Sequence, residues 1–190
     1  MRTLLGMVVV APGDPVEVEH ATRAMIRHPG PCYLRLGRVG EPTIHRADVS
    51  FQLGEAILVH QGCDLTLIST GGLLSVCVQV AEQLAKSGIE ARVLSMHTLK
   101  PLDTDAVLAA ARETGAIVTV EEHSIIGGLG SAVAEVLAEA GEVRVPFKRL
   151  GLPPDFSSPV GDQEYLQAAS GLNVDGILKS LDRILALVSR

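Results

Sequence analysis

The chain has 190 residues, of which 47% are apolar, and a formal net charge of −6 at pH 7. This length suits one substantial domain, or one domain with an appended unit. The acidic balance argues against nucleic acid as a partner, because phosphate contacts need clustered Lys and Arg side chains. Aromatic residues make up only 3% and Trp is absent, so rings for stacking bases are scarce as well.

The cysteines and the N-terminal apolar run indicate the cellular compartment. Cys32, Cys63 and Cys77 are odd in number and form no Cys-x-x-Cys pair, which favours reduced thiols over disulfides or a zinc site. The apolar run over residues 4–11 is too short to span a membrane and stops at a Pro-Gly-Asp turn. It lacks a signal-peptide cleavage pattern and is typical of a buried strand. We therefore expect a cytoplasmic protein without a membrane partner.

The first 38 residues predict a strand, a helix and a second strand. The uninterrupted apolar run Met7–Val10 is typical of a strand buried on both faces. Asp14 can cap a helix that opens with Pro15, and a Pro-Gly-Pro turn ends this helix before Cys32–Leu36 resumes extended structure. Residues 39–50 are rich in Gly, Pro, Thr, His and acids without a clear period, and we interpret them as a linker.

The rest of the chain alternates between strands and helices, which is typical of βαβ units with a parallel sheet covered on both faces. The expected strands are residues 64–70, 91–96, 116–122 and 143–150. The expected helices are residues 73–87, 103–114, 128–140 and a last helix that Asn173 caps, with an apolar stripe of Ile177, Leu181, Ile184, Leu185 and Val188. Pro146 cannot donate to a ladder, so the last strand is expected at an edge. The predicted fold class is a three-layer α/β/α fold with a mostly parallel sheet of about five strands.

The stretch VEEHSIIGGLGSAVAE, residues 120–135, joins the third of these strands to its helix. Ligands gather at the carboxyl ends of strands in an open α/β sheet, and free amides at a helix start can hold an anion. The candidates for such an anion site, or for a subunit contact, are Glu122, His123, Gly127, Gly128 and Gly130. The spacing is neither the dinucleotide fingerprint nor a phosphate loop. A tight turn for the glycines and a hydrogen-bonded structural role for His123 therefore remain the alternatives.

Two arginines follow the second N-terminal strand in the stretch RLGR. Arg35 and Arg38 suit a phosphate or a carboxylate at the end of a strand, because a guanidinium group offers a bidentate fork. Spacing alone leaves open whether they bind a ligand or are solvated charges. His60 and Cys63 form a single His-x-x-Cys without a second pair, so we expect no metal site there.

Four stretches, in order, resemble the transketolase family of thiamine-diphosphate enzymes. GPCYLRLGR resembles the end of the family's pyrimidine-binding domain, and DLTLISTGGLLSVCVQVAEQLAKSGIEARVLSMHTLKPLD resembles the start of its C-terminal domain. VTVEEHSIIGGLGSAVAE and the pattern GLPPDF....G....L....GL....I complete that domain. The resemblance divides the chain into a remnant of the pyrimidine-binding domain over residues 1–38, a linker over residues 39–50 and a transketolase C-terminal domain over residues 51–190.

This resemblance implies that the chain carries no catalytic residue and binds no cofactor or metal by itself. The family's glutamate that activates the cofactor precedes the matched part of the pyrimidine-binding domain, and the domain that binds diphosphate and metal is outside the resemblance. Thiamine diphosphate and Mg²⁺ would then belong to the complete enzyme. The family's arginine for the substrate phosphate falls on Arg38 through the L-x-R pattern, with Arg35 as an added candidate.

The expected function is that of a C-terminal fragment or subunit of a transketolase-like enzyme, inactive as an isolated chain. The complete enzyme would transfer two-carbon ketol units between sugar phosphates, and this chain would supply subunit contacts and part of the substrate channel. The resemblance implies a homodimer and a partner subunit, or further domains, that complete the enzyme. Two alternatives stay open: the same portion of a deoxyxylulose-phosphate synthase or of a 2-oxo-acid dehydrogenase beta subunit, and a stand-alone domain that binds an anion or regulates a partner.

Overall fold

The computed structural model describes residues 1–141, 144–154 and 159–188, with side-chain environments through residue 186. Its strands form a sheet of three and a sheet of five. In chain order the elements are β1 (Val8–Val10), α1 (Pro15–Arg27), β2 (Cys32–Leu34), β3 (Ile57–His60), β4 (Leu65–Thr70), a 3-10 turn (Gly71–Leu73), α2 (Leu74–Ala85), β5 (Ala91–Ser95), β6 (Thr98–Lys100), α3 (Thr104–Glu113), β7 (Ile117–Ser124), α4 (Leu129–Glu139), β8 (Phe147–Leu152), α5 (Gln163–Ala169) and α6 (Val174–Val188).

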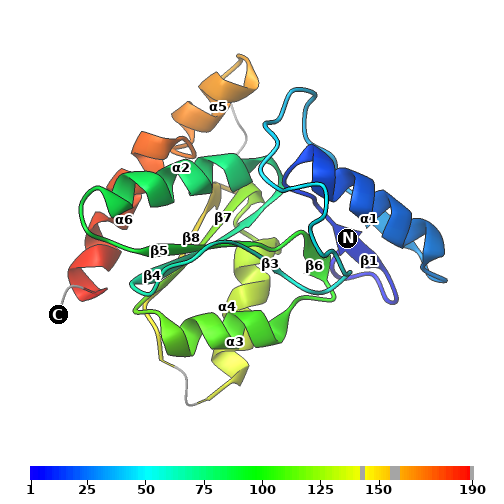
Figure 1. Cartoon of the computed structure of the whole chain (residues 1–190), viewed down its shortest axis with the longest axis horizontal. Coiled ribbons are helices and arrows are strands. Elements are labelled where there is room, and N and C mark those ends of the chain that lie inside the picture. The colour runs from blue at the N-terminus through cyan, green and yellow to red at the C-terminus, as the bar shows by residue number, and fades with distance from the viewer. Residues whose placement is uncertain (142–143, 155–158, 189–190) are drawn as a thin grey trace.

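The larger sheet has the order β3-β5-β4-β7-β8 and confirms the predicted α/β architecture. β4 pairs parallel with β5 and β7, β7 pairs parallel with β8, and β3 pairs antiparallel with β5 at the edge. Helices α2 and α6 cover one face of this sheet, and α3 and α4 cover the other (Figure 1). On the central strand, Leu67 points into the core under α2 and α6, while its neighbour Ile68 points into the core under α3 and α4.

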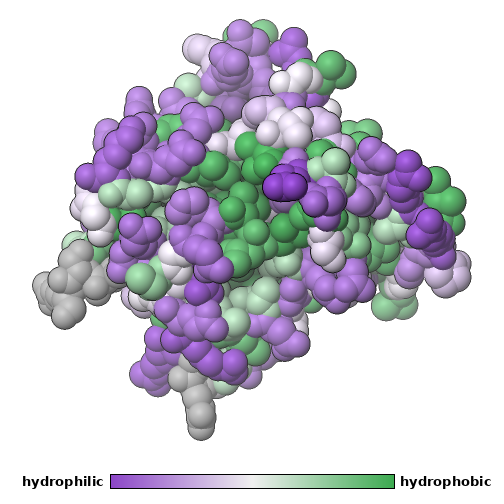
Figure 2. Space-filling model, in the orientation of Figure 1, coloured by the Kyte–Doolittle hydropathy of each residue, from purple (hydrophilic) through white to green (hydrophobic). Residues whose placement is uncertain are grey.

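Strand β3 was not among the strands expected from the sequence. It has four residues and shows no clear alternation of apolar and polar side chains, because it is an edge strand that is half-buried on both faces. Leu58 within it is 44% exposed. Figure 2 shows apolar surface near the centre of this view, where β3 lies, with polar surface over α2 and α3 on either side.

The N-terminal unit is less separate than we expected. β1 pairs parallel with β2, as the strand-helix-strand pattern predicts, but its other edge pairs antiparallel with β6, which follows β5 in the second part of the chain. The two parts still have two distinct sheets. β2 remains an edge strand among the described residues. The small core around Val8 and Val10 is completed by Phe51 and Leu53, which come directly after the expected linker.

The ends of the helices follow the capping residues in the sequence. Asp14 accepts a hydrogen bond from the Glu17 amide at the start of α1, with Pro15 as the first helical residue. Asp103 caps α3 through the Ala106 amide at 2.9 Å. Asn173 caps α6, since its side-chain oxygen accepts from the Gly176 amide at 2.9 Å. These three capping residues fix where the helices begin.

Helix α6 and strand β8 also agree with the sequence pattern where they are described. Ile177, Leu181 and Ile184 are buried against α2 and the sheet, and Leu185 packs beside them. The side chain of Val188 lies outside the described environment. β8 begins at Phe147, just after Pro146, and is the edge strand expected there, while residue 143 lies outside the described residues. None of the described helices is long and apolar enough to cross a membrane.

Candidate functional site

Arg35 reaches from the N-terminal unit to the carboxyl end of the larger sheet. Its amide donates to the Val10 carbonyl at 2.8 Å, which extends the pairing of β1 and β2 by one residue. Its guanidinium group donates to the backbone carbonyl of Glu122, at the end of β7, at 2.6 Å. The structure therefore brings together two of the candidate positions, Arg35 and Glu122, which are 87 residues apart in the chain.

Arg38 lines two adjoining cavities of about 540 and 390 Å³. Both cavities are lined by Arg38, Glu41, Gly72, Asp162 and Gln163, and the smaller one also by Arg35 and Glu122. Arg38 is exposed, and the structure records no ion pair for it within the described residues. A guanidinium group in this state keeps all of its donors available to a ligand.

Glu41 is the charged residue of this cavity that the sequence did not single out. Its carboxylate packs against the backbone of Gly37 and Gly72, where a Cβ atom on either glycine would collide with it. Its Oε1 is buried without a hydrogen-bond partner in the described structure. Burial, with the nearby charges of Glu122 and Asp14, raises the pKa of Glu41, and Arg35 offsets part of this rise. The smaller cavity thus combines two guanidinium groups with the carboxyl groups of Glu41, Glu122 and Asp162, and the pKa of Glu41 is raised.

The side chain of Glu122, on β7, accepts hydrogen bonds from the short helix α5. Its Oε2 accepts from the amide groups of Gln163 and Gln167 at 3.0 and 2.8 Å. Helix α5 has no buried residue of its own, so these two polar contacts contribute much of its attachment. Since Gln163 lines both cavities, Glu122 shapes the cavity wall as well as binding Arg35.

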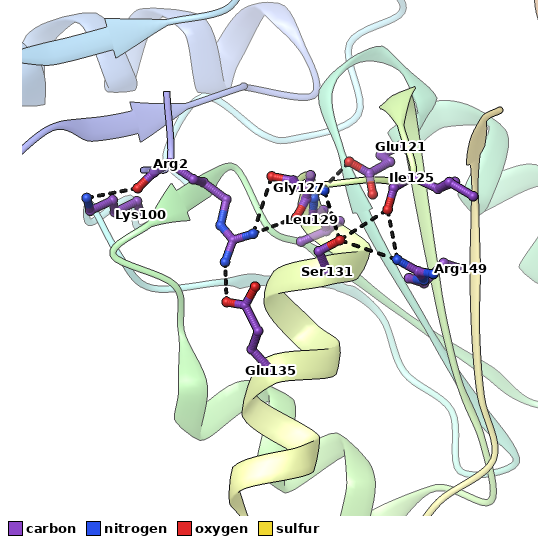
Figure 3. A network of polar contacts seen from close by, with 10 residues as sticks. Arg2, Lys100, Glu121, Ile125, Gly127, Leu129, Ser131, Glu135 and Arg149 are labelled. Atoms are coloured by element: carbon purple, nitrogen blue, oxygen red, sulfur yellow. Dashed lines mark hydrogen bonds and ion pairs between the residues drawn. The ribbon is translucent and has the colours of Figure 1, made fainter. Parts of the chain in front are cut away.

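The glycine-rich turn is occupied by a carboxylate of its own chain. Glu121 is fully buried and accepts hydrogen bonds from the amides of Leu129 and Gly130, both at 2.7 Å (Figure 3). Burial raises the pKa of Glu121, and these two amide donors counteract the rise. Gly128 is a glycine because a Cβ atom would collide with the Glu121 carboxylate, and Gly127 has a φ of 77°, which L side chains rarely adopt.

This arrangement weighs against the hypothesis of a free anion site at Gly127, Gly128 and Gly130. The positive end of α4 faces Glu121 already, so an external anion would have to displace a buried side chain. The alternative interpretation, in which the glycines form a tight turn, explains the φ of Gly127 and the close approach of Glu121 to Gly128. The carbonyls of Gly127 and Gly128 accept from Arg2, which also pairs with Glu135 on α4 (Figure 3). The N-terminal segment therefore covers part of this turn.

His123 is exposed beside the turn and lines neither cavity with Arg38. Its Nδ1 lies 3.0 Å from the carbonyl oxygen of Ser124, a local contact of the kind made by a structural histidine. Within the described part of the chain no group of three His, Cys, Asp or Glu residues could hold a metal ion. The cysteines Cys32, Cys63 and Cys77 are free thiols.

The comparison with known families agrees with this geometry. The family model described as transketolase, C-terminal domain, matches residues 54–177, and the chain belongs to this family. It is 40% identical over 184 residues to the 6-deoxy-6-sulfo-D-fructose transketolase subunit SqwH of Clostridium sp. (strain MSTE9), covering 97% of this chain and 56% of that protein. It is 39% identical over 181 residues to an apulose-4-phosphate transketolase subunit of Phocaeicola vulgatus, covering 95% of this chain and 57% of that protein.

A solved structure shares both the fold and much of the sequence. A split-gene transketolase, described as an inactive beta4 tetramer, superposes with a TM-score of 0.88 at 36% identity, covering 98% of this chain and 60% of that one. The chain therefore spans a little more than half the length of these relatives. It is a C-terminal piece of the transketolase type, as the three stretches that resemble the family's C-terminal domain predicted.

Proposed function

We propose that this chain is the C-terminal part of a split transketolase, which transfers two-carbon ketol units between sugars that carry a terminal anionic group. The observation that supports this most is the cavity lined by Arg38 and Arg35, at the carboxyl end of the sheet. The two relatives named above support the substrate class, since one name contains a sulfo group and the other a phosphate.

In this proposal Arg38 binds the phosphate or sulfonate at the far end of the sugar. A guanidinium group and a tetrahedral anion form charge-assisted, bidentate hydrogen bonds, each stronger than a neutral one. Arg35 is oriented by the Glu122 carbonyl and contributes a second positive charge. Burial raises the pKa of Glu41, which disfavours a negative charge on its carboxyl in the cavity. Gln163 offers a neutral donor and acceptor for sugar hydroxyls.

Thiamine diphosphate and Mg²⁺ would be bound mainly outside this chain. Bound thiamine diphosphate supplies the electron sink for breaking and forming the carbon–carbon bond. Among the described residues no three His, Cys, Asp or Glu side chains come together. Because the resemblance covers only the C-terminal part of the family, we assign the cofactor site to a partner subunit, and this chain supplies substrate positioning and subunit contacts.

The assembly that we propose is a cytoplasmic one. Two copies of this chain pair through their C-terminal domains, with α4 near the contact, and each copy joins a partner subunit that carries the cofactor site. The free thiols Cys32, Cys63 and Cys77 suit a reducing compartment. A specific interface between two copies needs roughly 1,000 Å² of buried surface in total.

The experiment that tests this proposal reconstitutes the chain with its partner subunit and measures ketol transfer from a ketose phosphate. Arg38→Ala should raise KM roughly tenfold to a hundredfold with little change in kcat, which corresponds to about 1.5–3 kcal/mol of lost charged hydrogen bonding. Arg46→Ala is the matched control, since Arg46 is exposed and pairs with Asp48 on the surface, away from both cavities. Unchanged KM in Arg38→Ala would contradict the proposed role of Arg38.

A further inference from the structure

The second half of the expected linker is anchored to the start of α1. The Oδ2 atom of Asp14 accepts hydrogen bonds from the amides of Ile44 and His45, at 2.8 and 2.7 Å. The Ile44 side chain packs against the core beneath α2 and α6, and His45 is only 8% exposed. Residues 39–50 form neither helix nor strand, so these contacts, rather than a ladder, hold the segment in place.

The imidazole ring of His45 lies between two buried carboxylates. Its Nδ1 is 3.2 Å from Asp14 Oδ2, and its Nε2 is 3.4 Å from Glu17 Oε1. Asp14 and Glu17 are both fully buried. These two contacts are within ion-pair distance, and neither ring nitrogen has a hydrogen-bond partner in the described structure. A protonated ring presents an N–H to both acids, whereas a neutral ring presents an N–H to one and a lone pair to the other.

The other titratable groups that face His45 are Asp14, Glu17 and His97. Burial raises the pKa of Glu17, against the opposing effects of Ser95, the Gly13 amide at 2.6 Å and His45. His97 faces the cluster from the end of β5, with its ring 4.0 Å from that of Phe51. Burial lowers the pKa of His97 to about 4, with a further lowering from the neighbouring charge of His45, so His97 is neutral above that pH.

The effect of pH on this cluster follows from the direction of the His45 shift. Burial lowers the pKa of His45, but Asp14 and Glu17 more than offset this, and the net pKa is raised above 6.5. A group whose pKa is raised on folding adds stability below its ordinary value, and this is lost as pH rises through the folded value. Asp14 acts in the opposite range, since burial alone would raise its pKa, but His45 and three backbone amides lower it by more. The stability that ionised Asp14 contributes is therefore lost only in acid, as the pH falls through its lowered pKa.

We propose that His45 is a positioning residue that clasps residues 39–50 to α1 while its ring is protonated, and so holds Arg38 and Glu41 on the wall of the cavity. The clasp itself stands on the contacts with Asp14 and Glu17, and only the use of the cavity rests on the proposed function. Pro42 also lines the cavity wall, two residues before the anchored Ile44, so release of the anchor reaches the cavity directly.

The first test follows amide hydrogen exchange and the His45 proton resonances of the full chain from pH 6 to 9. The protection factors of the Ile44 and His45 amides should fall by about tenfold per unit of pKa shift as His45 loses its proton, at a pH above 6.5. In His45→Gln the same amides should show low, pH-independent protection. His28→Gln, at the other end of α1, is the matched control and should behave as the unaltered chain does.

A second arm separates the clasp from the proposed function. Sulfate, whose charge is constant over this range, should bind less tightly at pH 9 than at pH 6, and His45→Gln should bind it weakly at both. No sulfate binding at any pH would overturn the anion site of the proposed function and the cavity role of His45, while the exchange data would still decide the clasp. A His45 ring that titrates below pH 6.5, or amide protection that is unchanged in His45→Gln, would overturn the clasp itself.

Discussion

Glu121 shows how one buried side chain bears on two interpretations of the same sequence. The glycines at 127, 128 and 130 look like an anion-binding helix start, and the anion is present in the chain itself, eight and nine residues before the amides that it accepts from. The sequence signal for this contact is the position of Glu121 near the end of a buried strand. A buried carboxylate needs hydrogen-bond donors, and the amides at the start of the next helix are the nearest ones along the chain.

The role of Glu121 can be tested with a single substitution. Glu121→Ala removes the acceptor for the Leu129 and Gly130 amides and leaves two buried donors unsatisfied. Each such donor costs about 1–3 kcal/mol, so the free energy of unfolding should fall by roughly 2–6 kcal/mol in urea denaturation. Glu122→Ala is the control from the adjacent position, because its side chain contacts Gln163 and Gln167 near the surface. Equal losses in the two variants would contradict this account.

The helices with strong capping residues were predicted closely, whereas two short strands, β3 and β6, were not predicted at all. Asp14, Asp103 and Asn173 each precede a helix and cap it in the structure, because a cap acts on neighbours in sequence. β3 and β6 have four and three residues. Their partners, β5 and β1, are chosen by tertiary packing, so a local pattern carries little information about them.

Part of the cavity could be predicted and part could not. Arg35 and Arg38 were found because two arginines at the end of a strand suggest anion binding. Glu41 lies in a stretch without periodicity, and Gln163 belongs to a helix far from both arginines in the chain, so no sequence spacing links them. The segment that carries Glu41 was expected to be a linker, and its anchoring depends on Asp14, for which the sequence predicts only a helix cap.

Helix α6 offers a test of how capping and burial share its stability. Asn173→Ala removes the acceptor for the Gly176 amide, and such a change costs about 1 kcal/mol. Asn173→Asp keeps an acceptor at the same position and should be close to neutral. Leu181 is fully buried under α2, so Leu181→Ala should lower the free energy of unfolding by about 2–5 kcal/mol. Thermal and urea unfolding in which Asn173→Ala loses more stability than Leu181→Ala would show that the cap dominates instead.

The whole molecule is a C-terminal transketolase domain with a strand-helix-strand unit joined to it by β6 and by the anchored residues 39–50. The chain spans a little more than half of the related subunits, and its own acidic and histidine side chains do not gather into a metal site in the described parts. The central claim of the proposed function is therefore a division of labour, in which this chain positions substrate and a partner holds the cofactor.

Calorimetric titration of the isolated chain with thiamine diphosphate and Mg²⁺ tests this division most directly. We expect no saturable heat at cofactor concentrations up to about 1 mM, because the proposed function assigns the residues that bind diphosphate and metal to a partner subunit. The same titration after mixing with the partner subunit should show saturable binding. Binding to the isolated chain with a dissociation constant of about 10 µM or tighter would contradict the account, since this chain would then hold a cofactor site of its own.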